Sequence, residues 1–182
     1  MSPLLSSKKI CKSFKYPQSI EILKDISLDL FPGQSMAIMG RSGEGKSTLL
    51  QILGTLDEPT SGELFIAGKS VLHHPPSSLR NQHIGFIFQS FHLLEEYSVI
   101  HNVLMPALIA GYDIGPKSPA FKRALSLLER VGLSDRVDYD TRLLSGGEKQ
   151  RVALARAFCN NPEIILADEP SGNLDHTTAE HI

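Results

Sequence analysis

The segment from Gly40 to Thr48 carries residue types that bind phosphate groups. It lies between a short apolar run and a pattern typical of a helix start. Glycines let successive backbone N–H groups surround an anion, and a helix dipole adds partial positive charge. Lys46 adds a full charge and is expected to take part in catalysis as well as in binding, and the Ser47 hydroxyl can bind Mg²⁺. The predicted nucleotide-binding residues are Gly40, Arg41, Ser42, Gly43, Glu44, Gly45, Lys46, Ser47 and Thr48. The alternative is a glycine turn that only caps a helix.

Two adjacent carboxylates, Asp168 and Glu169, follow the apolar run 164–167. Parallel-sheet proteins place catalytic groups at this end of a strand. Side chains of neighbouring residues leave a strand in different directions, so the two acids are expected to do different work. We expect Asp168 to hold the Mg²⁺ shell and Glu169 to polarise an attacking water. Without the glycine-rich loop, the pair would fit a solvated strand end equally well.

The octapeptide Leu-Ser-Gly-Gly-Glu-Lys-Gln-Arg at positions 144–151 opens a predicted helix. Ser145 and Glu148 have the Ser-x-x-Glu spacing of a capping box, in which each side chain satisfies an N-terminal backbone donor. A capped helix start that contains two glycines is also an anion site. Structural and ligand-binding interpretations of this segment are therefore compatible.

This octapeptide is similar to the signature of ATP-binding cassette (ABC) ATPases, and the resemblance covers nearly the whole chain. It implies a Q-loop at Gln89, which takes part in catalysis and binds the metal, and a D-loop at residues 171–175. It places the adenine ring beside Phe14, which fits the family pattern better than Tyr16; core packing is the alternative for Phe14. It also implies a homodimer in which Ser145 and Gly147 of one subunit meet the γ-phosphate bound to the other.

Residues 79–94 and 102–106 resemble the LolD group of lipoprotein-releasing ATPases, with the MacB and FtsE types as close relatives. The resemblance implies ATP and Mg²⁺ as cofactors and integral membrane permease subunits, similar to LolC and LolE, as partners. It places the chain peripherally on the cytoplasmic face of the bacterial inner membrane. Some of the residues 91–97 are expected to contact the membrane subunit. Departures from the family pattern are Glu44, Phe14 and Ser171, where a small residue, Tyr and Thr are usual.

The sequence patterns around these groups indicate the strands and helices that must position them. They predict an α/β fold of the P-loop NTPase type, with a mixed sheet core, an antiparallel β subdomain and an inserted helical subdomain. Residues 21–30 alternate as an antiparallel strand does, and 36–39, 84–88 and 164–167 are apolar runs that fit buried strands. Ser118, Pro119 and Gly132 delimit a helix with one apolar stripe. We expect a single domain over 1–182, with its core at about 1–90 and 145–182 and the helical part at about 91–144.

Composition narrows the function classes. The 18 basic and 20 acidic residues give a formal net charge of −2, so no global field favours nucleic acid or anionic lipid. Membrane contact is therefore expected only through partners. Cys11 and Cys159 have no ligand-like spacing, and His73 and His74 lack further zinc ligands, so we assign no disulfide and no zinc.

The family also has a closing strand and a switch histidine beyond the D-loop, and we expect both to be missing here. His176 and His181 lie too near Asp168 to be that histidine. Weak or absent hydrolysis by the 182-residue chain is the corresponding expectation. Two other function classes fit the sequence less well. A non-transport ABC ATPase would need a second cassette, a coiled-coil insertion or basic surfaces, and a small-molecule kinase would leave the signature unexplained.

Overall fold

The computed structural model describes residues 2–15 and 19–170. Contacts divide the chain into two compact units, Met1–His83 and Ile84–Ile182. The D-loop expected at 171–175, together with Tyr16, His176 and His181, lies outside the described residues. Among the described helices, none is long and apolar enough to cross a membrane.

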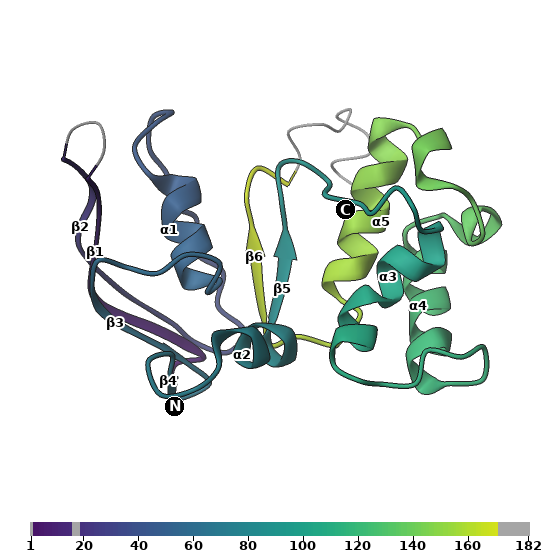
Figure 1. Cartoon of the computed structure of the whole chain (residues 1–182), viewed down its shortest axis with the longest axis horizontal. Helices are drawn as coiled ribbons and strands as arrows, with labels where there is room; N and C mark the ends of the chain where they lie inside the picture. The colour runs from purple at the N-terminus through teal and green to yellow at the C-terminus, as the bar shows by residue number, and fades with distance from the viewer. Residues whose placement is uncertain (1, 16–18, 171–182) are drawn as a thin grey trace. The chain divides into compact units, whose positions relative to one another are not determined.

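The first unit contains an antiparallel sheet in the order β2-β1-β3-β4 (Figure 1). Its strands are β1 (Leu5–Phe14), β2 (Ile20–Leu30), β3 (Ser61–Ile66) and β4 (Lys69–Ser70), and its helices are α1 (Lys46–Leu53) and α2 (Pro76–His83). The predicted alternation in β2 is confirmed from Ile26 onward, where apolar residues are half-buried and polar ones exposed. Buried residues of this unit include Leu5, Ile10 and Ile66.

The apolar run 36–39 does not form the buried strand that we predicted. No strand pairs with it among the described residues of its unit, and Met36 and Met39 are 45% and 90% exposed. A uniformly apolar run becomes a buried strand only where neighbouring strands and covering helices supply partners. The four-stranded sheet of this unit supplies none, so the segment stays outside its ladder.

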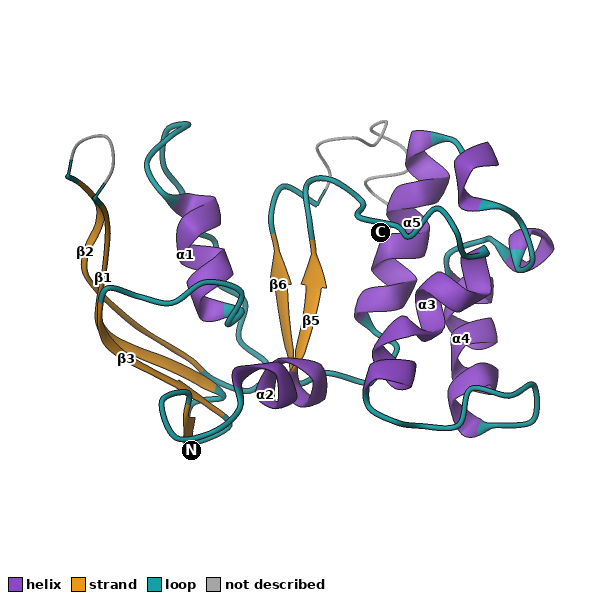
Figure 2. Ribbon diagram, viewed as in Figure 1, coloured by secondary structure: helices purple, strands orange, loops and turns teal. Residues whose placement is uncertain are grey.

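The second unit combines two parallel strands with a group of helices, as the secondary-structure colours of Figure 2 show. The strands are β5 (Ile84–Ile87) and β6 (Ile164–Ala167), paired from Ile84–Ile164 to Ile87–Ala167. The helices are α3 (Val99–Ile109), α4 (Pro119–Arg130) and α5 (Gly146–Ala157), with short 3₁₀ turns at Ser134–Arg136 and Thr141–Leu143. Both predicted strands are therefore confirmed.

Helix α4 follows the predicted pattern closely. The Ser118 side chain accepts a hydrogen bond from the Phe121 N–H, and Pro119 is the first helical residue. Gly132, just after the helix, has φ of 70°. Ala124 and Leu128 are fully buried against α3 and α5, whereas Leu125 at the edge of the stripe is 38% exposed. The helical character of this segment was thus readable from its sequence.

Strand β5 approaches α5 very closely at Gly85. A Cβ atom at this position would lie 2.3 Å from the Ala157 carbonyl oxygen and 2.7 Å from Ile165 Cδ1. Only a residue without a side chain permits that approach. The end of α5 and the start of β5 are therefore held in direct backbone contact.

Candidate functional site

The loop before α1 has the backbone that anion binding needs. Gly43 and Gly45 have φ of 83° and 87°, and α1 begins directly afterwards at Lys46. A Cβ atom on Gly45 would lie 2.5 Å from Ile22 Cγ2, so the position requires glycine for space as well as for its backbone angle. No side chain caps this helix and no acidic residue occupies its first turn. Its N-terminal N–H groups therefore remain suited to a phosphate.

Charged side chains of the loop make only local contacts. Lys46 Nζ donates to the Gly40 and Arg41 carbonyl oxygens at 2.9 and 2.8 Å. The Glu44 carboxylate accepts the Arg41 N–H at 2.7 Å. A carboxylate thus holds one of the loop's backbone donors, and an incoming phosphate competes with it. Ser47 is exposed and Thr48 half-buried in the first turn of α1.

Phe14 ends strand β1 in the same unit as the loop and is 43% exposed. The Lys12 ammonium lies 5.2 Å from the centroid of its ring. Part of the ring is therefore open to a ligand, while a cation lies against it. The core-packing interpretation of Phe14 does not fit this exposure.

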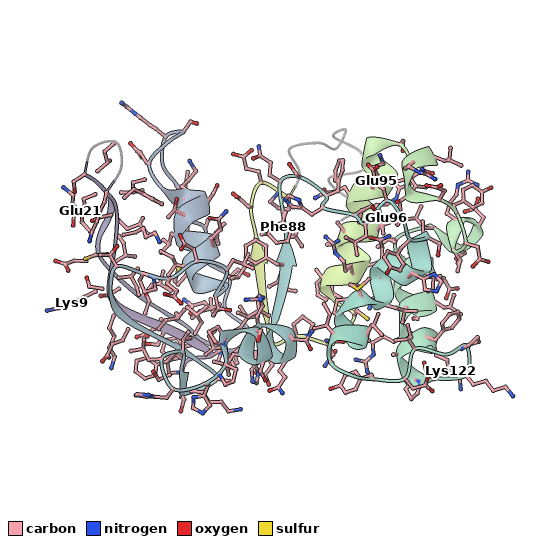
Figure 3. The ribbon with its side chains drawn as sticks, viewed as in Figure 1. Lys9, Glu21, Phe88, Glu95, Glu96 and Lys122 are labelled. Atoms are coloured by element: carbon pink, nitrogen blue, oxygen red, sulfur yellow. The ribbon has the colours of Figure 1, made fainter. Side chains whose placement is uncertain are left out.

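The second unit brings Gln89, Asp168 and Glu169 together. Gln89 follows β5, and its Nε2 donates to Glu169 Oε2 at 2.8 Å. The Asp168 N–H donates to the Ile87 carbonyl oxygen at 2.9 Å, which continues the β5 to β6 pairing by one residue. Figure 3 shows Phe88 at this end of β5. Carboxylate and amide groups from two chain segments thus meet where neighbouring parallel strands end.

Asp168 and Glu169 differ in exposure and backbone conformation, and simple strand alternation does not explain this difference. Strand β6 stops at Ala167, and Glu169 adopts a left-handed φ of 47°. Asp168 is half-buried and Glu169 exposed. A left-handed residue other than glycine is uncommon and costs free energy, and such residues cluster at functional sites. The two carboxylates therefore lie in different surroundings.

Helix α5 opens with the predicted capping box. The Ser145 Oγ accepts the Glu148 N–H at 3.3 Å, and Glu148 Oε2 accepts the Ser145 N–H at 2.8 Å. These bonds from Ser145, with Arg136 nearby, lower the pKa of Glu148 from its ordinary value. Ser145 is exposed and Gly147 half-buried at the helix start. The prediction of a capped helix is confirmed.

Two residues of α5 hold the segments that carry the site, and sequence reasoning missed both roles. Arg156 donates to the Phe91 and His92 carbonyl oxygens at 2.7 and 2.6 Å, just beyond Gln89. Gln150, which is 3% exposed, donates to the Pro170 carbonyl oxygen at 2.8 Å, just beyond Glu169. Burial lowers the pKa of Arg156. For Arg156, the sequence offered one signal. It is a charged residue on a helix face that otherwise carries Val152 and Ala155.

Asn102 organises the chain between Gln89 and α3 in a similar way. It is fully buried; its Oδ1 accepts the Leu94 N–H at 2.7 Å, and its Nδ2 donates to the Leu94 carbonyl oxygen at 3.0 Å. The same Nδ2 group also donates to the carbonyl oxygens of Tyr97 and Ser98. The same segment borders a hollow of about 330 Å³ lined by Glu95, Glu96, Tyr97, Ser98, Asp138, Asp140 and Arg142.

Comparisons with known proteins agree with these features. The sequence profile of the ABC transporter family matches residues 23–172. The lipoprotein-releasing system ATP-binding protein LolD of Protochlamydia amoebophila is 54% identical over 176 residues, 97% of this chain and 77% of that protein. LolD of Myxococcus xanthus is 49% identical over 183 residues, 98% of this chain and 80% of that protein.

Solved structures support the fold. The dimeric bacterial ABC transporter cassette MJ0796 superposes with a TM-score of 0.87 at 41% identity, covering 98% of this chain and 79% of that one. A post-hydrolysis form of MJ0796 bound to ADP and phosphate gives a TM-score of 0.87 at 40% identity, with the same coverage of both chains. The predicted fold class is thereby confirmed.

Proposed function

Because this chain belongs to the ABC transporter family of ATP-binding domains, we propose that it powers the release of lipoproteins from the bacterial inner membrane. Family membership makes it an ATP-binding and ATP-hydrolysing subunit. The observation that carries the lipoprotein assignment is the 54% identity with a LolD protein over 97% of the chain. The geometric support for hydrolysis is the Gln89 to Glu169 hydrogen bond beside Asp168.

Each predicted site residue then has a role. The loop from Gly40 to Thr48 binds the ATP phosphates through its N–H groups and Lys46, and Phe14 stacks on the adenine. Mg²⁺, when bound, neutralises charge on the phosphates, and Ser47, Gln89 and Asp168 are the residues that would hold it. The exposed Ser47 hydroxyl, the Gln89 amide oxygen and the Asp168 carboxylate are oxygen ligands of the kind that Mg²⁺ binds. Glu169 polarises the attacking water.

The bond from Gln89 orients the Glu169 carboxylate. Gln89 donates an N–H to one carboxylate oxygen, and the other is proposed to accept a proton from the attacking water. Gln150 and Arg156 keep the two backbone segments in place. The site therefore relies on positions set before the nucleotide arrives, as electrostatic catalysis requires.

The active form is proposed to be a homodimer in which Ser145 and Gly147 of one subunit contact the γ-phosphate bound to the other. The dimeric structure of the MJ0796 cassette supports the homodimer. Ser145 donates its hydroxyl proton to Glu148 Oε2 at 2.8 Å, so contact with a phosphate would redirect that proton. The domain organisation expected from the sequence, a nucleotide-binding core with an inserted helical part, belongs to the same proposal.

Membrane permease subunits, similar to LolC and LolE, are the proposed partners, and they would hold the chain at the cytoplasmic face of the membrane. The supporting surface is the segment after Gln89, where Leu94 and Tyr97 are 40% and 45% exposed. Glu95 and Glu96, labelled in Figure 3, lie on the same segment. Apolar contact area beside acidic groups suits a partner segment with basic residues.

Reconstitution tests the proposed function. The chain is combined with the permease subunits of its own genome in liposomes that carry a lipoprotein, and ATP-dependent release is measured beside phosphate production. We expect ATP-dependent release with weak phosphate production by the 182-residue chain, and we expect Glu169→Gln to bind ATP normally while phosphate production falls to background.

The matched control is Glu129→Gln, an exposed carboxylate on α4, which should retain full turnover. ATP hydrolysis without lipoprotein release would contradict the assigned substrate. Full turnover by Glu169→Gln would contradict the role of Glu169. Phosphoryl transfer to a small acceptor instead of water would favour the kinase interpretation.

A further inference from the structure

Lys12 and Phe14 are neighbours on one face of β1. Residues two apart in a strand point to the same side, and the Lys12 ammonium lies 5.2 Å from the centroid of the Phe14 ring. A cation at this distance is attracted to the face of an aromatic ring. The lysine therefore restrains the ring from one side.

The Lys12 ammonium is itself held firmly. It donates to Asp57 Oδ1 at 2.8 Å and to the Glu58 carbonyl oxygen at 2.7 Å. The Lys12 side chain is 12% exposed and that of Asp57 is 34% exposed. Two of its three donors thus have fixed partners while the charge also faces the ring. A flexible surface lysine would not supply such a restraint.

Asp57 belongs to the turn that follows α1, so the restraint leads back to the phosphate-binding helix. The Leu56 and Asp57 N–H groups donate to the Gln51 carbonyl oxygen of α1 at 2.8 and 3.3 Å. Further along, Thr60 Oγ1 accepts the Ser13 N–H at 2.9 Å. Lys12 and Ser13 of β1 are therefore both joined to the chain that follows α1.

We propose that Lys12 is a positioning residue that holds the Phe14 ring at a set place relative to the phosphate-binding loop, with Asp57 as its anchor. This inference rests on the proposed function, in which Phe14 stacks on the base of ATP. An ordered ring loses little freedom when a base stacks on it, so the restraint favours binding of the base. Binding of the triphosphate alone does not involve the ring.

Binding of two probes separates these contributions. ATP carries a base, whereas inorganic tripolyphosphate does not, and the affinity of the chain for each is measured with Mg²⁺ present. For Lys12→Met we expect ATP to bind about three- to tenfold more weakly and tripolyphosphate to bind as before. Lys12→Arg keeps a cation over the ring and should restore ATP binding to within about twofold.

Lys8 provides a matched control on the same strand. Its ammonium lies 5.1 Å from the centroid of the Phe65 ring, so Lys8→Met removes a similar cation and ring pair elsewhere in the sheet. This variant should bind both probes normally. Retained tripolyphosphate binding also shows that each variant is folded. If Lys12→Met does not fold, Asp57→Asn replaces it, with a smaller selective loss of ATP binding expected.

Other results would overturn the inference. Equal losses for ATP and tripolyphosphate, unchanged ATP binding by Lys12→Met, or Lys12→Arg binding as weakly as Lys12→Met would each contradict a role through Phe14. A failure of the unaltered chain to bind either probe would instead overturn the proposed function, and this inference with it.

Discussion

The phosphate-binding loop and the ends of β5 and β6 differ in how far along the chain their polar partners lie. In the loop, Lys46 bonds to carbonyls five and six residues away, and Glu44 to an N–H three residues away. At the strand ends, Gln89 and Glu169 are 80 residues apart, and Arg156 reaches back 65 and 64 residues. The polar bonds of the loop are therefore set by local sequence, whereas the strand-end site exists only when its unit has folded.

This difference separates ligand binding from stability. A loop with exposed local bonds can rearrange around phosphates without disturbing the core. Bonds that join distant segments contribute to the folded state, and their loss is felt in the free energy of unfolding. Substitutions in the two regions should consequently differ in what they change.

Lys46→Ala should have the largest effect of these substitutions. It should change ATP binding and leave stability nearly unchanged. Loss of the lysine ammonium that binds the triphosphate should weaken ATP binding by about 1,000-fold, or about 4 kcal/mol. The free energy of unfolding should change by less than about 0.5 kcal/mol, because the lysine bonds only to exposed loop carbonyls. Titration calorimetry and urea denaturation measure the two quantities.

The comparison variant is Lys24→Ala, an exposed lysine on β2 that should change neither quantity. A loss of stability above about 2 kcal/mol in Lys46→Ala would show that the loop is not locally formed.

Arg156→Met, in contrast to Lys46→Ala, should mainly lower stability. The Phe91 and His92 carbonyls lose a charged donor, so the free energy of unfolding should fall by about 3 kcal/mol. Turnover should fall as well, since the segment after Gln89 loses its anchor. Urea denaturation and phosphate release are the measurements. A stability loss no larger than that of Arg130→Met, at the exposed end of α4, would remove Arg156 from this role.

Substitutions at Glu148 test a third kind of bond. The capping-box bonds of Glu148 are local in sequence, as in the phosphate-binding loop, but they lie at the start of α5, the helix that holds the strand-end site. Glu148→Ala should lower the free energy of unfolding by about 1 kcal/mol, whereas Glu148→Gln keeps an acceptor and should cost less. The pKa of Glu148 is lowered from 4.5 by the Ser145 bonds, so its contribution is complete above pH 4.5 and is lost as pH falls through the folded-state value.

The glutamine variant has no such titration. In acid the unaltered chain should therefore lose stability relative to Glu148→Gln, as measured by thermal unfolding at a series of pH values. Parallel pH curves for the two proteins would show that the capping box does not contribute in this way.

Glu44→Gln should have the smallest effect. It keeps an acceptor for the Arg41 N–H but removes a negative charge beside the phosphates, so ATP affinity should rise about threefold, or about 0.7 kcal/mol. Unfolding should not change. Glu63→Gln, an exposed position on β3, is the control for charge alone. Weaker ATP binding by Glu44→Gln would mean that the carboxylate assists the nucleotide.

Local features of this fold were predictable because short stretches of sequence determine them. The helix start at Lys46, the Ser118 cap and the Ser145–Glu148 capping box each depend on residues within one turn. The motifs also named Gln89, Asp168 and Glu169, although not the hydrogen bond between Gln89 and Glu169.

Features that depend on distant partners were not predictable. The apolar pattern at 36–39 indicated a strand but carries no information on what pairs with it. Arg156 looked like an ordinary charge near a helix end, because its two carbonyl partners lie more than 60 residues earlier in the chain. The positive φ of Glu169 also follows from its surroundings and not from its residue type.

Gly85 limits which sequences this fold can tolerate. A methyl group at this position would lie 2.3 Å from a backbone carbonyl oxygen that cannot swing aside as a side chain does. Any replacement must therefore push α5 away from β5. Since α5 carries both anchors of the site, Gln150 and Arg156, a substitution that touches no ligand should still be eliminated from a library selected for turnover. The position can vary only together with the helix that lies across it.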